Sequence, residues 1–148
     1  LFRVAKYAQH FSTVVVMIQK EVAQRINAKV GTKDYGILTL KMQYYFTPKY
    51  EFTVKSHLFS PPPKVDSAVI SLIPRIDKPE IENEKFFWHI VETAFRNRRK
   101  MLRRNLREII SKEKIEKLKE FCPVDLSRRG ETLDEKEFIE LYEAMKGL

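Results

Sequence analysis

A run of twelve residues, 96–107, carries most of the positive charge of this chain. It reads RNRRKMLRRNLR and has a net charge of +7, within a 148-residue chain whose total is +8. Cations gathered in this way favour an anionic partner, with nucleic acid before membrane lipid. The seven candidate RNA-binding residues are Arg96, Arg98, Arg99, Lys100, Arg103, Arg104 and Arg107.

The spacing of five of these cations predicts one broad face of a helix, on which they can follow the phosphates of an RNA backbone. Leu102 and Leu106 mark the opposite, buried side. The alternative is a solvent-exposed face with ion pairs along the helix. We favour RNA contact because the segment contains no acidic residue to pair with its cations. The five are Arg96, Lys100, Arg103, Arg104 and Arg107.

The other reactive residue types form no catalytic or metal-binding set. Three histidines are scattered along the chain, and the single cysteine, Cys122, excludes an internal disulfide and a cysteine-rich metal site. Serines and aspartates show no triad arrangement. Lys20, in the stretch Gln-Lys-Glu that follows an apolar run, either contacts RNA phosphate or only stabilises the fold.

Residues 1–77 have the pattern of an α/β region. The apolar run 11–18 predicts a strand buried on both faces, as in a parallel sheet covered by helices. A helical pattern follows over 19–28, and three prolines make 59–64 (FSPPPK) a stiff loop. Further strands or mixed segments are expected at 38–46 and 51–54, broken at Pro48, and an alternating strand at 65–73.

Residues 78–148 predict helices only. The pattern over 82–110 fits one long helix or two consecutive ones, and a short charged helix is expected at 112–121. Two capping-box patterns, Thr132 with Glu135 and Asp134 with Glu137, mark the start of a last helix. The fold class is therefore α/β followed by a small all-α region.

The predicted sheet is incomplete. A buried parallel strand needs a neighbour on each side, and residues 1–77 hold three or four strands. We therefore expect this chain to be the C-terminal piece of a larger protein. A sheet cut through its middle exposes an apolar edge, which predicts marginal stability or self-association of the fragment.

Five stretches read together resemble the ribosomal RNA adenine dimethyltransferases, which place two methyl groups on N6 of adjacent adenines of small-subunit rRNA. The resemblance covers nearly the whole chain in family order, and the proline loop with its following strand is its most specific part. The stretches are VVVMIQKEVAQRI (14–26), GTKDYG (31–36), LFSPPPKVDSAVISLIP (58–74), AFRNRRKMLRRNL (94–106) and GETLDEKEFIELYEAM (130–145).

The resemblance implies that residues 1–77 are the C-terminal half of a Rossmann-like class I methyltransferase sheet. Residues 78–148 would then be a helical RNA-binding domain. The family's Gly-rich loop for S-adenosylmethionine and its Asn-Leu-Pro-Tyr catalytic motif are not among these residues. The resemblance therefore assigns no catalytic, cofactor-binding or metal residue here, and we expect this piece alone to be inactive.

Phe59 matches the aromatic residue that the family places at the lip of the target-base pocket. A base pulled out of its stack regains part of the unstacking energy on an aromatic face, about 1–3 kcal/mol per base. The alternative is a core aromatic that precedes a strand. The loop residues Pro61, Pro62, Pro63 and Lys64 would hold Phe59 in place.

The resemblance further implies small-subunit rRNA in a 30S pre-ribosome as the partner, a cytoplasmic location and a monomeric intact enzyme. One rival is a non-catalytic RNA-binding, ribosome-assembly or transcription-factor relative of the same fold. A basic membrane-surface protein is a weaker rival, because such a protein is expected to carry a tryptophan-rich amphipathic face and Trp88 is the only tryptophan. No apolar run is long enough to span a bilayer.

Overall fold

The computed structural model describes all 148 residues, which divide into two compact units. The first, called here the N-terminal unit, comprises Leu1–Lys29 and Lys33–Pro79. The second, called here the helical unit, comprises Glu80–Leu148 together with Val30–Thr32. None of the helices combines the length and the apolar character that a membrane crossing needs.

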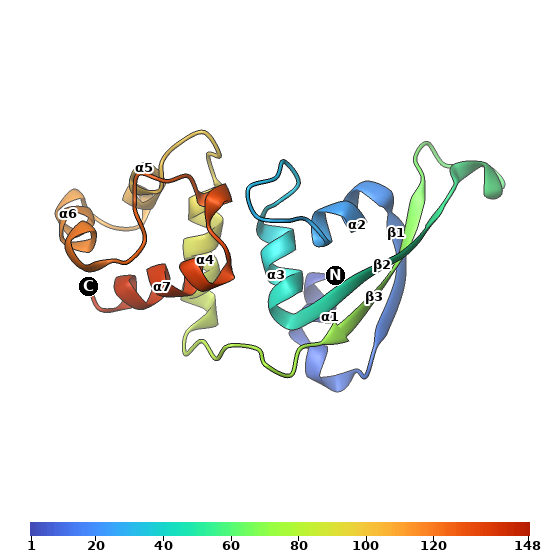
Figure 1. The fold of residues 1–148 in the computed structure, drawn as a ribbon, viewed down its shortest axis with the longest axis horizontal. Helices are drawn as coiled ribbons and strands as arrows, with labels where there is room; N and C mark the ends of the chain where they lie inside the picture. The colour runs from blue at the N-terminus through green and yellow to red at the C-terminus, as the bar shows by residue number, and fades with distance from the viewer. The chain divides into compact units, whose positions relative to one another are not determined.

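The N-terminal unit is built on an antiparallel sheet of three strands in the order β1-β3-β2. Figure 1 shows α2 and α3 on one face of this sheet. Its strands are β1 (Val14–Gln19), β2 (Phe46–Val54) and β3 (Ser67–Pro74). Its helices are α1 (Phe2–Lys6), α2 (Lys20–Ile26) and α3 (Ile37–Tyr45), with short 3-10 turns at Ala8–His10 and Ser56–Leu58.

The prediction that the first strand is buried on both faces is wrong. In β1, Val14, Val16 and Ile18 pack on the core, whereas Val15 and Met17 are 64% and 54% exposed. The strand is short, antiparallel and at an edge of the sheet, so the helices cover only one of its faces. An apolar run alone does not distinguish one buried face from two.

Two further predictions in this unit are wrong. Residues 38–46 lie mostly in α3 rather than in a strand, and β2 runs through Pro48 without a break. Pro48 is tolerated because β2 is an edge strand, where a missing N–H need not remove a ladder hydrogen bond. The alternating strand is confirmed, since Ala68, Ile70 and Leu72 of β3 are fully buried.

The helical unit contains four α-helices. They are α4 (Glu84–Phe95), α5 (Leu102–Asn105), α6 (Lys112–Phe121) and α7 (Glu135–Lys146), with 3-10 turns at Leu106–Glu108 and Gly130–Thr132. The last two α-helices match the sequence expectation. Ser111 caps α6 by accepting a hydrogen bond from the Lys114 amide, and Asp134 forms the predicted capping box with Glu137.

A continuous helical face over 96–107 is not formed, because α4 ends at Phe95 and residues 96–100 are turns and bends. The buried Asn105 side chain, 2% exposed, donates hydrogen bonds to the carbonyls of Ala94 and Asn97, each at 3.0 Å. The first bond satisfies a carbonyl in the last turn of α4, and the second ties the turn after α4 to α5, where the Asn97 carbonyl also accepts from the Lys100 amide at 3.1 Å. Gly130 packs so closely that an added Cβ would lie 2.7 Å from the Ala94 oxygen.

Candidate nucleic-acid interface

The proline loop connects β2 to β3 at one end of the sheet. Phe59 follows the 3-10 turn Ser56–Leu58, is half-buried, and donates its backbone N–H to the Ser56 carbonyl at 3.2 Å. The peptide between Ser60 and Pro61 is cis. The loop residues Pro61, Pro62, Pro63 and Lys64 are exposed. Phe59 is therefore not a fully buried core residue, and part of its ring surface is open to solvent.

Asp66 closes the base of this loop. Its Oδ1 accepts a hydrogen bond from the Ser56 amide at 2.9 Å, and its Oδ2 lies 3.4 Å from Lys55 Nζ. The hydrogen bond from the Ser56 amide, helped by the charges of Lys55 and Lys20, holds the pKa of Asp66 below its ordinary value. Because the Asp66 backbone carbonyl accepts from the Lys20 amide at 3.0 Å, the loop base and the start of α2 are tied together.

The structure thus places the Gln-Lys-Glu stretch and the base of the proline loop at the same end of the sheet. Gln19, the last residue of β1, pairs with Ser67 of β3, which also pairs with Val54, the last residue of β2. Sequence reasoning missed Asp66. The signal was its place directly before a strand and after a turn, where aspartate often accepts backbone amides.

Two of the seven predicted RNA-binding cations are paired inside the protein. Arg96 forms an ion pair with Glu108, and Arg98 with Glu131 at 3.0 Å. The argument that these cations lack an acidic partner is therefore wrong for both, because the acids come from outside residues 96–107. The five cations of this segment that form no ion pair are Arg99, Lys100, Arg103, Arg104 and Arg107.

A backbone pairing fixes the course of the basic segment. The amides of Leu102 and Arg103 donate to the carbonyls of Arg128 and Leu126 at 2.8 and 3.0 Å. Met101 also forms an isolated β-bridge with Arg129. The basic segment is therefore held by a stretch that lies more than twenty residues further along the chain, rather than by helical periodicity.

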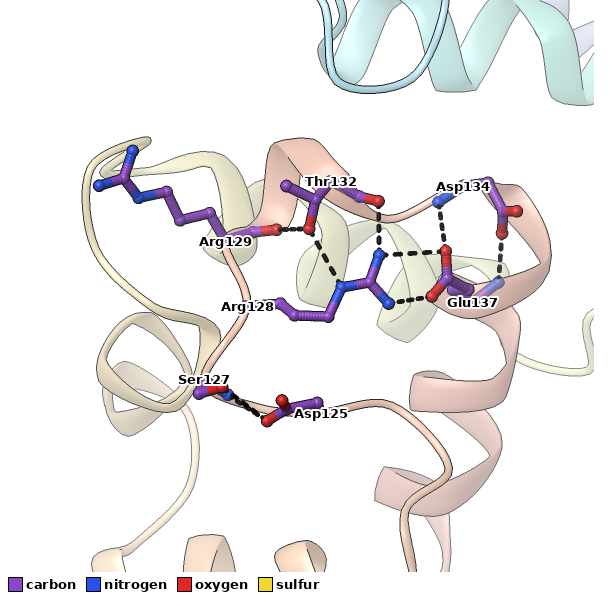
Figure 2. A network of polar contacts seen from close by, with 7 residues as sticks. All are labelled: Asp125, Ser127, Arg128, Arg129, Thr132, Asp134 and Glu137. Carbon is purple, nitrogen blue, oxygen red and sulfur yellow. Dashed lines mark hydrogen bonds and ion pairs between the residues drawn. The ribbon is translucent and has the colours of Figure 1, made fainter.

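That stretch is itself fixed by a polar network around Arg128 (Figure 2). The Arg128 guanidinium forms an ion pair with Glu137 and donates to the Thr132 carbonyl at 2.6 Å. The hydrogen bond from Arg128 holds the pKa of Glu137 below its ordinary value. Arg129 differs, since it is exposed and its side chain extends away from the network (Figure 2). It is a cation next to the basic segment that sequence reasoning missed.

The sequence of residues 1–146 matches the family model described as ribosomal RNA adenine dimethylase. The chain belongs to this family. It is 45% identical over 141 residues to the ribosomal RNA small subunit methyltransferase A of Geobacillus thermodenitrificans, covering 91% of this chain and 48% of that protein. The protein of the same name from Clostridium acetobutylicum is 45% identical over 135 residues, with 89% and 49% covered.

Solved structures of methyltransferases share the fold. A dimethyladenosine transferase from Plasmodium falciparum superposes with a TM-score of 0.74 at 26% identity, over 93% of this chain and 58% of that one. The 23S rRNA methyltransferase ErmE gives 0.57 at 23% identity, over 91% and 55%, and shows the fold alone. The chain spans about half the length of the curated family members that it matches.

Proposed function

We propose that the protein to which these residues belong is an rRNA adenine N6,N6-dimethyltransferase. It transfers methyl groups from S-adenosylmethionine to two adjacent adenines of small-subunit rRNA during ribosome biogenesis. The observation that carries this proposal is the match of residues 1–146 to the ribosomal RNA adenine dimethylase family. The substrate is the rRNA of a 30S pre-ribosome, and the intact enzyme acts as a cytoplasmic monomer.

The residues described here do not fit S-adenosylmethionine. The only glycines are Gly31, Gly36, Gly130 and Gly147, and β1 passes into α2 through Gln19 and Lys20 without a glycine-rich turn. We therefore assign the cofactor and the catalytic motif to other residues of the longer protein. On this basis we expect the 148-residue chain alone to transfer no methyl group.

Each unit has a proposed role. The prediction that residues 1–77 complete a Rossmann-like methyltransferase sheet is supported by the fold shared with known methyltransferases. There, Phe59 would stack on the target adenine after it leaves the RNA stack, with the three prolines limiting the motion of the loop. Residues 78–148 would bind rRNA through the exposed cations of the basic segment.

The first test is methyl transfer by the longer protein. Tritiated S-adenosylmethionine is incubated with unmethylated small-subunit particles, and the labelled nucleosides are separated. We expect label in N6,N6-dimethyladenosine, and none from the 148-residue chain. Primer extension on the treated RNA should stop at two adjacent adenines. Absence of transfer by the longer protein, with RNA binding retained, would instead favour the non-catalytic relative.

Self-association is expected only of the 148-residue chain. Met17, Val69 and Phe52 are register partners across the three strands, and Met17 and Phe52 are more than half exposed. The free edge of β1 lies beside this apolar row. In sedimentation velocity, the apparent mass of the chain should rise with its concentration. The Met17→Lys variant should have a lower apparent mass than the unmodified chain at the same concentration. A concentration-independent monomer contradicts the expectation.

A further inference from the structure

The helical unit has a hollow that is lined almost wholly by charged side chains. Its volume is about 510 Å³. One wall comes from the basic segment and the other from α6, and the buried Ile115 is its one apolar lining residue. The seven lining residues are Lys100, Arg103, Arg104, Arg107, Ile115, Glu116 and Lys119.

The charge of this hollow is strongly unbalanced. Five lining residues are cationic, and Glu116 is the single acid. Lys119 Nζ lies 3.1 Å from both carboxylate oxygens of Glu116, so these two residues largely neutralise each other. The other four cations form no ion pair, although Arg103 is close enough to Asp125 to contribute to lowering the pKa of that carboxyl. Repulsion among them is relieved when an anion enters.

We propose that this hollow is a binding site for the phosphodiester backbone of RNA, and that α6 contributes Lys119 to it. The proposal rests on the RNA-binding role proposed above and extends it to a helix outside the basic segment. Three arginines offer planar donor pairs that match phosphate oxygens. An acidic peptide is a poorer fit, because Ile115 is the only apolar surface available to its side chains.

Glu116 provides a direct test of the proposal, because removing the negative charge of Glu116 should increase the affinity for RNA. With phosphate in the hollow, Glu116 repels the ligand and competes for Lys119. Glu116→Gln should therefore tighten binding roughly two- to fivefold, the range measured for exposed charge pairs. A gain in affinity cannot come from misfolding. The matched control is Glu113→Gln, an exposed acid of α6 that does not line the hollow.

Lys119→Gln should have the opposite effect. It removes one phosphate contact and leaves Glu116 uncompensated, so RNA affinity should fall. The salt slope should decrease by less than the one unit expected of an unpaired cation, because Glu116 already neutralises part of the Lys119 charge. Its control is Lys117→Gln, which removes the same charge from an exposed position of α6 outside the hollow. Circular dichroism of all four variants checks that α6 is retained.

The experiment measures fluorescence anisotropy of a labelled RNA hairpin of about 16 base pairs against the chain at several salt concentrations. If Glu116→Gln binds RNA as tightly as its control Glu113→Gln, and Lys119→Gln as tightly as Lys117→Gln, the hollow is not the phosphate-binding site. The proposed RNA-binding role of the chain would then still stand. If the unmodified chain binds the hairpin without salt dependence, or not at all, the proposed RNA-binding role itself fails. If labelled polyglutamate binds more tightly than the hairpin and responds to the same variants, the hollow is a peptide site and the proposal is wrong.

Discussion

The proline loop of the N-terminal unit and the basic segment of the helical unit differ in how they are fixed and in what they offer a ligand. The loop is closed by local contacts, chiefly those of Asp66 with Ser56 and Lys55, and presents an aromatic ring. The basic segment is held by partners distant in sequence and presents charge. The first suits the positioning of one base, and the second suits contact with a backbone that carries little sequence information.

The largest expected effect concerns the anchoring of the basic segment. Asn105→Asp replaces a buried amide donor by an acceptor that faces the carbonyls of Ala94 and Asn97. We expect the free energy of unfolding to fall by about 2–4 kcal/mol, measured by denaturant titration. The control is Asn97→Asp, because its exposed oxygen accepts from the Arg99 amide and aspartate can do the same. Equal losses in the two variants would mean that Asn105 does not anchor the segment.

The second prediction separates base contact from packing in the proline loop. Phe59→Ala in the longer protein should lower methyl transfer by up to about a hundredfold, the equivalent of one lost base stack. Its melting temperature should change little, since Phe59 is only half-buried. Leu58→Ala, at a neighbouring apolar residue that is 68% exposed, is the control and should keep its activity. A parallel loss of activity and melting temperature in Phe59→Ala would point to a packing role.

The third prediction sharpens the distinction between paired and unpaired cations. Replacing Arg99 and Arg104 by glutamine should lower the slope of log K against log salt concentration by about two, because each cation is available to a phosphate. The same change at Arg96 and Arg98 should have a smaller effect, since Glu108 and Glu131 already neutralise them. Anisotropy titrations of both double variants decide this. Identical slopes would show that the internal ion pairs open on binding.

The smallest expected effect is a dependence of stability on acid pH. The pKa of Asp66 in the N-terminal unit and that of Glu137 in the helical unit are both lowered in the folded protein. Each carboxylate therefore stabilises the fold fully above its ordinary pKa, and this contribution is lost as the pH falls through the lowered value. Urea midpoints should decrease over this acid range, and less so in Asp66→Asn and Glu137→Gln. Unchanged pH dependence in both variants would assign the decrease to other groups.

Sequence patterns were reliable where local chemistry decides the structure. The alternation around Ile70 and the capping box of Asp134 with Glu137 were both predicted and are confirmed. Sequence patterns were unreliable where contacts with a distant segment decide the local structure. Residues 38–46 are mostly helical although their pattern predicts strand or mixed structure. The helical periodicity after Phe95 is interrupted over residues 96–101 and resumes only in the short α5 and the 3-10 turn Leu106–Glu108. Asn105 takes its role from contacts that no local pattern contains.

The sequence by itself determined the family, the stiffness of the proline loop and the concentration of charge in residues 96–107. These properties depend on residue identity and on neighbours along the chain. Only the tertiary structure decided which cations are neutralised and which line a hollow with Lys119 of α6. The reason is physical: electrostatic interactions fall off with distance in space, and folding brings Glu131 to Arg98 across thirty-three residues of sequence.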